Sequence, residues 1–232
     1  MQAIFETVFD VLYLVSVITL GIIMIMKNGG RKERLLFGIM ALTLGSGDAF
    51  HLVPRAVALC TTGLESYSVE LGIGKLITSI TMTLFYILLY YVWRERYGIQ
   101  GRKGLTAGIY TLAVLRVLLC LCPLNFWTET DAPLVWGIYR NIPFALMGLI
   151  IIVLFFRSAR QAKDRSFRFM WLTIALSFAF YLPVVLLSGR YPAVGVLMIP
   201  KTCAYVWTVL IGFMDRRTGE SGRKLCASGS EG

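Results

Sequence analysis

The sequence contains one histidine, His51, and five cysteines that form no metal-binding pattern. Structural zinc sites need four Cys or His ligands, and their paired cysteines are commonly separated by about two to four residues. The cysteines at 120 and 122 are separated by one residue, and a single histidine cannot complete a site. We therefore expect no metal and no other cofactor. A disulfide between Cys60 and Cys120 stays open, although buried free thiols are the common state.

Charged residues are also scarce, because they make up 16% of the chain while hydrophobic residues make up 57%. The apolar residues occur in long blocks and do not alternate with polar residues as they would in a soluble sheet. A bilayer core about 30 Å thick requires roughly 20 apolar residues for each helical span. We predict an all-α, polytopic membrane protein with seven transmembrane helices. The predicted spans are approximately 9–27, 35–60, 69–93, 104–122, 134–156, 168–188 and 194–214.

The N-terminus lacks the basic region with which a cleavable signal peptide begins, and it carries Glu6 and Asp10 instead. The first apolar block is long enough to cross a membrane, so we expect it to be retained as a helix. The cell membrane is the expected location.

Basic residues are unevenly distributed, and they give the chain a net charge of +10. Most of them follow the first, third, fifth and seventh predicted spans, whereas the intervening loops hold acids and only Arg190. Cytoplasmic loops of membrane proteins carry an excess of Lys and Arg. The pattern predicts an external N-terminus and a cytoplasmic C-terminus, and it explains the charge without nucleic-acid binding. The four clusters consist of Lys27, Arg31, Lys32, Arg34, Arg94, Arg96, Arg102, Lys103, Arg157, Arg160, Lys163, Arg165, Arg168, Arg216, Arg217, Arg223 and Lys224.

Two parts of the chain resemble each other when the sequence is compared with itself at a shift of 130 residues. Residues 37–54 and 167–184 then share seven of eighteen positions, and a loop four residues shorter aligns Lys75 with Lys201. Apolar helices share letters by chance, but matched threonines and a matched intramembrane lysine are harder to explain in that way. The matched pairs are Phe37/Phe167, Met40/Met170, Leu42/Leu172, Thr43/Thr173, Ala49/Ala179, Phe50/Phe180 and Leu52/Leu182.

An internal duplication predicts a 3+1+3 arrangement of parallel repeats within a membrane domain at 1–217. The first repeat covers about 9–93, the linker helix 104–122 and the second repeat about 134–214, and we expect a disordered cytoplasmic tail at 218–232. This arrangement resembles that of SWEET sugar transporters, PnuC-type vitamin-precursor transporters and PQ-loop proteins, although the PQ dipeptide is absent. Repeats of this kind commonly place a substrate site between the two halves, near the midplane.

Five basic residues lie inside the predicted spans, namely Arg55, Lys75, Arg116, Arg140 and Lys201. Each is about six or seven residues, or roughly 10 Å, from the outer end of its span. A single Lys or Arg at this depth can extend its charged group to the interface. Five at one depth favour a shared, outward-facing hydrated cavity in the bundle interior, because isolated charges in lipid are unfavourable.

The stretch SGDAFHLVPR, residues 46–55, places Asp48, His51 and Arg55 at spacings i, i+3 and i+7. At 100° per residue these side chains form one narrow stripe, which we expect to face the cavity. Asp48 could be an acid/base group or a structural partner of a cation. His51 could be catalytic or a structural hydrogen-bond donor.

The same stretch contains features that shape the helix backbone. Pro54 cannot donate a hydrogen bond to the carbonyl of Phe50, so we expect a free acceptor and a kink beside His51. Gly45 and Gly47 predict close contact with a neighbouring helix at this level.

The ligand class follows from the balance of charges in the predicted cavity. Five cations face one evident acid, Asp48, and arginine is suited to phosphate and carboxylate groups. We therefore expect an anionic small molecule or a lipid head group, with membrane lipids as the other partners. Nearby hydroxyl groups could contribute to binding or form hydrogen bonds between helices. The predicted ligand-binding residues are Arg55, Lys75, Arg116, Arg140, Asn141, Tyr181, Lys201 and Tyr205.

The segment LGSGDAFHLVPR, residues 44–55, resembles the Gly-Asp segment of YhhN-type lysoplasmalogenases, which hydrolyse the vinyl ether bond of lysoplasmalogens. The resemblance implies Asp48 as an acid/base residue near a phosphate head group. Vinyl ether cleavage requires protonation of a carbon, which a carboxylic acid can supply. This chain has one helix fewer than that family, and Phe178 occupies the repeat position of Asp48.

A seven-helix bundle with Lys201 on its last span also resembles a rhodopsin, but Lys201 lies near the outer end of that span. The predicted function is a transporter or receptor with a cationic intramembrane cavity. The alternative is a membrane-embedded lysophospholipid or vinyl-ether hydrolase, in which Asp48 is the acid/base and His51 orients it or a water molecule.

Overall fold

The computed structural model describes residues 2–61, 63–129, 133–188 and 190–215, and it is all-helical in this part of the chain. Seven helices are long and apolar enough to cross a membrane, which confirms the predicted spans apart from small differences at their ends. The predicted tail at 218–232 lies outside the described residues. The long helices are α1 (Gln2–Met26), α2 (Lys32–Cys60), α3 (Ser68–Arg96), α4 (Lys103–Leu121), α5 (Leu134–Gln161), α6 (Met170–Leu187) and α7 (Met198–Phe213).

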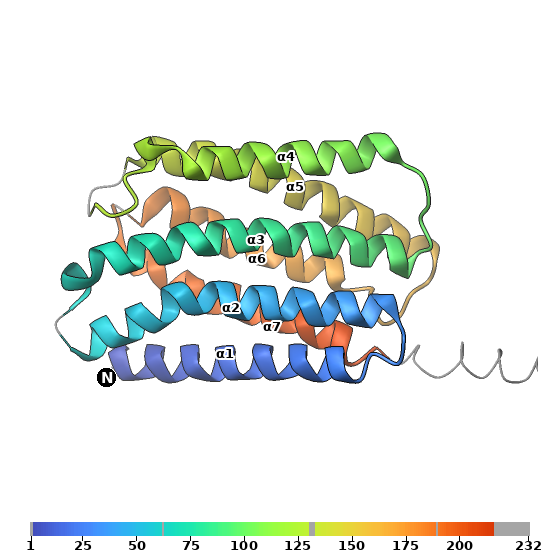
Figure 1. The fold of residues 1–232 in the computed structure, drawn as a ribbon, viewed down its shortest axis with the longest axis horizontal. Coiled ribbons are helices and arrows are strands. Elements are labelled where there is room, and N and C mark those ends of the chain that lie inside the picture. The colour runs from blue at the N-terminus through green and yellow to red at the C-terminus, as the bar shows by residue number, and fades with distance from the viewer. Residues whose placement is uncertain (1, 62, 130–132, 189, 216–232) are drawn as a thin grey trace, which may run out of the picture.

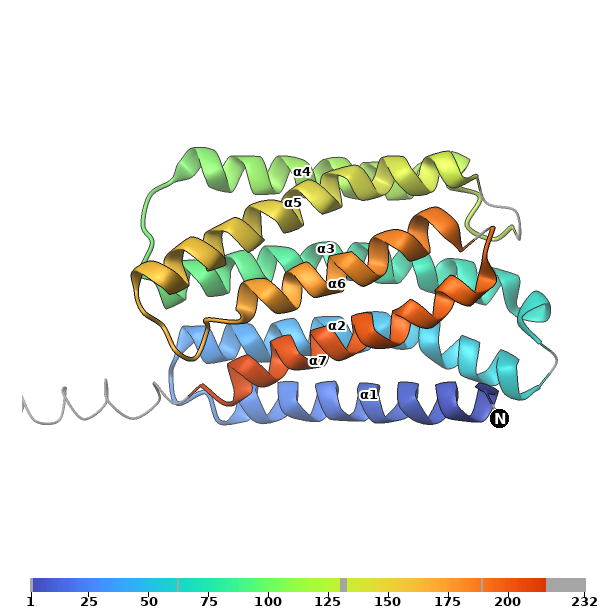
Figure 2. The same ribbon diagram turned by 180° about the vertical axis from the view of Figure 1, so that it is seen from behind.

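Consecutive long helices run in opposite directions, as Figures 1 and 2 show. The ends of α1, α3, α5 and α7 therefore lie at the same end of the bundle, together with the starts of α2, α4 and α6. We call this end the basic end, because the predicted clusters of Lys and Arg follow these four helices. Three short 3-10 helices lie at the opposite end, at Leu64–Tyr67, Pro123–Asn125 and Pro192–Leu197.

The helices pack in chain order around the bundle. Each helix contacts the next, α7 returns to contact both α1 and α2, and α3 also contacts α5. Within each predicted triplet the middle helix packs against both outer helices, so α2 lies between α1 and α3 and α6 lies between α5 and α7. The two triplets thus have the same packing order, while the repeat itself stays a prediction.

The bundle has an aromatic interior and an apolar outer surface. Fully buried side chains include Phe85, Tyr86 and Tyr90 of α3, and these pack in edge-to-face contacts with aromatic rings of other helices and of α3 itself. Large apolar residues such as Leu118 of α4 and Leu149 of α5 are exposed on the outside. An exposed apolar surface of this kind is suited to contact with lipid chains.

Glycine allows α2 to approach its neighbours closely, as the sequence predicts. A Cβ atom added to Gly47 would collide with the side chain of Thr81 on α3, and one added to Gly45 would lie 2.8 Å from Ile18 Cγ1 on α1. Because the hydrophobic effect does not drive helices together within lipid, close backbone packing of this kind is a main source of helix association in membranes. The two glycines therefore fix the position of α2 between α1 and α3.

Pro54 lies inside α2, whose helical hydrogen bonding continues to Cys60. Figures 1 and 2 show that α2 bends in the half that leads to its C-terminal end. The carbonyl of Phe50, which Pro54 leaves without its helical donor, faces Gly74 of α3, where an added Cβ would collide with it. The Phe50 carbonyl thus lies against Gly74, a residue of α3 that has no side chain.

Candidate functional site

Two polar contacts join α1 to α2 on the stripe that the sequence predicts. The Tyr13 hydroxyl donates a hydrogen bond of 2.6 Å to Asp48 Oδ2, and Arg55 Nη2 lies 2.8 Å from Glu6 Oε2. Glu6 and Tyr13 are seven residues apart on α1, as Asp48 and Arg55 are on α2. Because the helices are antiparallel, the same two-turn spacing brings both pairs into register.

Asp48 also interacts with a cation from the other side of the bundle. The charge of Lys201, on α7, acts on the Asp48 carboxylate, and both residues are only 8% exposed. Lys201 Nζ lies 5.3 Å from the ring centroid of Tyr181 and 5.5 Å from that of Tyr205. Cation–π contacts of this kind stabilise an ammonium group that has lost its water.

Arg116 of α4 is the most completely enclosed of the predicted intramembrane cations. It is 2% exposed, and its guanidinium carbon lies 3.4 Å from the ring centroid of Phe144 on α5. Its Nε and Nη1 atoms are buried and have no hydrogen-bond partner among the described residues. Leaving a buried polar group unpaired is unfavourable by about 1–3 kcal/mol, and by more when the group is charged.

The side chains of Arg140 and Asn141, which are adjacent on α5, have different environments. Arg140 is half-buried, donates a hydrogen bond of 2.7 Å to Asn125 Oδ1, and stacks on Trp127 at 4.2 Å. Asn141 is buried and accepts a hydrogen bond of 3.0 Å from the Tyr181 hydroxyl. Asn141 is therefore bonded to Tyr181, which lies beside Lys201, whereas Arg140 binds Asn125 in the segment that follows α4.

His51 and Lys75 are less enclosed than Asp48, Arg116 and Lys201, although the charge of Lys201 acts on His51. Lys75 is exposed, while its predicted repeat partner Lys201 is buried. The His51 Nδ1 atom is buried and has no hydrogen-bond partner in the described part of the chain. The two matched lysines thus have different surroundings in this conformation.

We define the interior site as the enclosed charges and the polar side chains around them. Its members come from α1, α2, α4, α5, α6 and α7, and all but Tyr181 are buried. Of the predicted site residues, Arg55, Lys75, Arg140 and His51 lie outside this group. The interior site consists of Tyr13, Asp48, Arg116, Asn141, Tyr181, Lys201 and Tyr205.

The structure corrects the assumption that Asp48 is the one acid near the five cations. Glu6 pairs with Arg55, and Asp10 lies within electrostatic range of Arg55 and Asp48. Tyr13 was not among the predicted site residues either, because the first span was interpreted only as a topology signal. Glu6, Asp10 and Tyr13 have the spacing i, i+4 and i+7, which is the signal that identifies a polar stripe on a helix.

Two hollows lie away from the interior site. A cleft at the basic end is lined by Arg31, Glu33, Arg34, Phe37, Gly212 and Asp215. An apolar groove of about 210 Å³ separates parts of α3 and α4, between Ile80 and Leu118. The groove faces the outer, apolar side of these helices, and its lining offers a ligand hydrocarbon contacts only.

Thiols and acids in the described residues do not suggest a metal centre. Cys60, Cys120, Cys122 and Cys203 are free, so Cys60 and Cys120 are not bridged. No group of three or more His, Cys, Asp or Glu side chains there is arranged to hold a metal ion.

Comparisons with known proteins identify no relative: no family model, no curated protein and no solved structure matches the chain. The fold of the described residues is a bundle of seven helices that are long and apolar enough to cross a membrane. The side chains described above are therefore the basis for inferring a function.

Proposed function

We propose that this integral membrane protein binds a small anion, or the anionic head group of a lipid, at the interior site and acts as a transporter or receptor. The observation that carries the proposal is Arg116, a buried guanidinium whose Nε and Nη1 donors have no partner among the described residues. An anion with carboxylate or phosphate oxygens would accept hydrogen bonds from these donors.

The charge balance of the interior site supports an anionic ligand. Arg116 and Lys201 are its two cations, and each charge acts unfavourably on the other. The negative charge of Asp48 offsets one of them, and its carboxylate also accepts a hydrogen bond from the Tyr13 hydroxyl. A bound anion would offset the second positive charge, so the site would be more stable with the ligand than without it.

The aromatic surroundings also favour a small ligand. Phe144 covers one face of the Arg116 guanidinium, while Tyr181 and Tyr205 flank Lys201. These rings exclude water, and electrostatic interactions are stronger where water is excluded. Since the two cations are almost completely enclosed, a ligand can enter only when the helices move apart. A site that must open to exchange its ligand is typical of a transporter.

The predicted duplication is the second support for transport. The matched residues Phe37 and Phe167 contact each other edge to face, with ring centroids 5.7 Å apart. In a parallel repeat, equivalent residues meet where the symmetry axis passes between the halves. We accordingly propose that an axis along the membrane normal relates α1–α3 to α5–α7, with the N-terminus outside and the C-terminus in the cytoplasm.

Anion binding can be measured as thermal stabilisation of the purified protein in detergent. Sodium phosphate, sodium acetate and a lysophospholipid with an anionic head group are compared with chloride at equal ionic strength. A ligand present at 100 times its Kd stabilises the folded state by about 2.7 kcal/mol. We expect stabilisation by at least one of these anions in the wild type and its loss in Arg116→Gln.

Arg190→Gln is the matched control, because Arg190 is exposed and stacks on its neighbour Tyr191. It removes the same charge and should keep the wild-type response. Equal stabilisation of Arg116→Gln and the wild type by every anion would contradict the proposed site. Uptake of radiolabelled phosphate or acetate into proteoliposomes then separates a transporter from a receptor.

Hydrolysis of a lysophospholipid is the second candidate, favoured by the enclosure of Asp48 and its short hydrogen bond from Tyr13. A carboxyl group that is shielded from water is suited to proton transfer. In this case the lysophospholipid would be consumed, and the wild type would release an aldehyde from a vinyl-ether substrate. Release of product from a lysoplasmalogen, absent in Asp48→Asn, would replace the transport proposal.

A further inference from the structure

The basic end contains a further buried cation, Arg96, at the end of α3. Its side chain is 1% exposed, and it binds the carboxylate of Asp164 through two hydrogen bonds, from Nε at 2.8 Å and from Nη2 at 3.0 Å. Arg96 Nη1 also contacts Glu33 Oε1 at 3.1 Å and Asp215 Oδ2 at 2.5 Å. We call these four residues the Arg96 network.

The Arg96 network joins four segments that are distant in the sequence. Glu33 lies at the start of α2 and Arg96 at the end of α3, two helices of the first predicted triplet. Asp164 lies between α5 and α6, and Asp215 follows α7, which are the helices of the second predicted triplet. Both acids of the second half therefore bind a cation of the first, and the network closes the bundle across the boundary between the halves.

Asp164 is held in place by its own loop. Its Oδ1 atom accepts hydrogen bonds from the backbone N–H groups of Ser166 at 3.1 Å and of Phe167 at 3.3 Å. The carboxylate thus arranges the loop and binds Arg96 at the same time. Loss of Arg96 would remove the bond between this loop and α3.

An aromatic layer lies against the network. The Arg96 guanidinium carbon is 4.1 Å from the ring centroid of Phe167, which contacts Phe37 of α2 and Phe155 of α5. Phe37 also lies against Gly212 of α7, where an added Cβ would collide with the ring. Charged groups and aromatic rings therefore close this end together, and α7 can approach α2 because residue 212 has no side chain.

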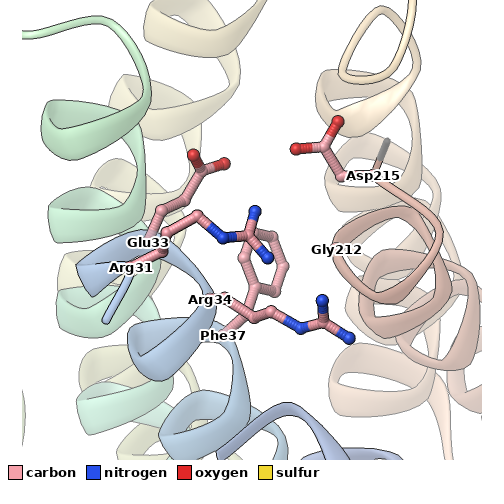
Figure 3. Close-up of a pocket in the computed structure, with 6 residues that line it drawn as sticks. All are labelled: Arg31, Glu33, Arg34, Phe37, Gly212 and Asp215. Carbon is pink, nitrogen blue, oxygen red and sulfur yellow. The ribbon is translucent and has the colours of Figure 1, made fainter. Parts of the chain in front are cut away.

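The cleft shown in Figure 3 marks the boundary between the two halves. Arg31, Glu33, Arg34 and Phe37 extend from the α2 side, and Gly212 and Asp215 lie on the α7 side. Figure 3 shows the side chains of Glu33 and Asp215 on opposite sides of the cleft. Both acids contact Arg96, so the cleft is closed on one side by the Arg96 network.

We propose that the Arg96 network is the gate at the basic end of the bundle, closed in this conformation, and that it opens when α7 moves away from α2. The inference rests on the proposed function for what the gate would admit, namely an anion on its way to or from the interior site. Gate opening itself is independent of any ligand.

The chemistry of the network suits a gate with two states. While the end is closed, Arg96 is shielded from water and is paired with carboxylates on three other segments. When the end opens, water hydrates all four charged groups at once. The groups are therefore paired in the closed state and hydrated in the open state. An intermediate separation would leave buried charges without partners and is therefore disfavoured. Packed interfaces with two discrete arrangements are the usual basis of such transitions.

The alternative is that the Arg96 network is a permanent structural contact. Hydrogen exchange distinguishes this alternative from a gate that opens. Exchange is measured by mass spectrometry on the full chain in lipid nanodiscs, with no ligand added. For Arg96→Gln we expect exchange about tenfold faster or more in peptides covering the start of α2, the loop 162–169 and the end of α7. Peptides covering the opposite end, including the 3-10 helices, should exchange as in the wild type.

Arg94→Gln is the matched control for the lost charge. Arg94 lies on the same turn of α3 but binds the α3–α4 loop, through Ile99 O and Gly101 O, and the start of α4, through Thr106 Oγ1. Its removal should change exchange only in that loop and at the start of α4.

Gly212→Ala tests the gate without touching the network. The new methyl group should push Phe37 and α7 apart and reproduce the local increase in exchange. Gly108→Ala on α4 is the control, because nothing lies within 4 Å of the added Cβ atom.

Two outcomes would overturn the gate. Faster exchange at both ends of the bundle in Arg96→Gln would mean that Arg96 holds the whole fold together. Wild-type exchange at the basic end in both Arg96→Gln and Gly212→Ala would mean that the closed end does not open. A failure of anion binding at Arg116, with the local response intact, would remove the proposed ligand but leave the gate.

Discussion

Tyr13 donates a hydrogen bond of 2.6 Å to Asp48, and this bond joins the first two helices inside the bundle. Tyr13 is 3% exposed, so the bond is shielded from water along with the carboxylate that it reaches. A hydrogen bond to a charged group in such surroundings contributes more than one between neutral groups. The pair therefore fixes the orientation of Asp48 toward α1 as well as the register of α1 on α2.

Tyr13→Phe should destabilise the folded protein by about 1.5–3 kcal/mol, because the ring stays in place while Asp48 loses its donor. The midpoint of thermal unfolding in detergent, compared with the wild type, measures the loss. Tyr139→Phe is the control, since the Tyr139 side chain is exposed on α5. An unchanged midpoint for Tyr13→Phe would show that the hydroxyl adds nothing to stability.

Gly47→Ala should separate α2 from α3. The added methyl group collides with Thr81, and overpacking of this kind is unfavourable by about 1–3 kcal/mol. Gly104→Ala, where nothing lies within 4 Å of the new Cβ atom, should leave stability unchanged or improve it through helix propensity. Equal unfolding midpoints for the two variants would show that α2 can shift without loss.

The helices were predictable from the sequence because a membrane span is defined by length and composition within one segment. The position of Gly47 against a neighbouring helix was predictable for a similar reason, since small residues mark close contacts. The partners of individual charges were not. The interior position of Lys201 and the exposed position of Lys75 depend on how each helix is rotated in the bundle, which their matched sequence context does not reveal.

The Arg96 network shows the same limit at the basic end. Arg96 belongs to a cluster of basic residues that the positive-inside rule explains as a topology signal, so nothing in its sequence context distinguishes it from Arg94. Its three carboxylate partners are 63, 68 and 119 residues away in the chain. Only the return of α7 to α2, together with the loop before α6, brings them together.

The predicted topology can be tested with reporter fusions. Since the basic clusters follow α1, α3, α5 and α7, a reporter fused after Lys224 should be active in the cytoplasm. A reporter inserted in the loop 123–133 should be active outside. The reverse pattern would place the basic end outside and the interior site nearer to the cytoplasm.

The role of Asp48 can be separated from that of Lys201 by replacing each residue alone and then both. Asp48→Asn keeps the shape of the side chain and its bond to the Tyr13 hydroxyl, but it removes the negative charge that offsets Lys201. If the interior site binds an anion, the affinity for phosphate or acetate should stay the same or increase, because a competing charge is gone. Lys201→Met should weaken binding, by about 1.5–3 kcal/mol if a charged hydrogen bond to the ligand is lost.

The double variant then decides whether the two residues act as a pair. If they do, Asp48→Asn combined with Lys201→Met should unfold at a higher temperature than the sum of the two single effects predicts, because neither charge is left buried alone. Binding by titration calorimetry and turnover of a lysoplasmalogen are measured on all four proteins. Loss of turnover in Asp48→Asn with binding retained would identify a hydrolase. Wild-type binding by Lys201→Met would show that Lys201 serves only as the counterion of Asp48, and Arg116 would then be the one cation that holds the anion.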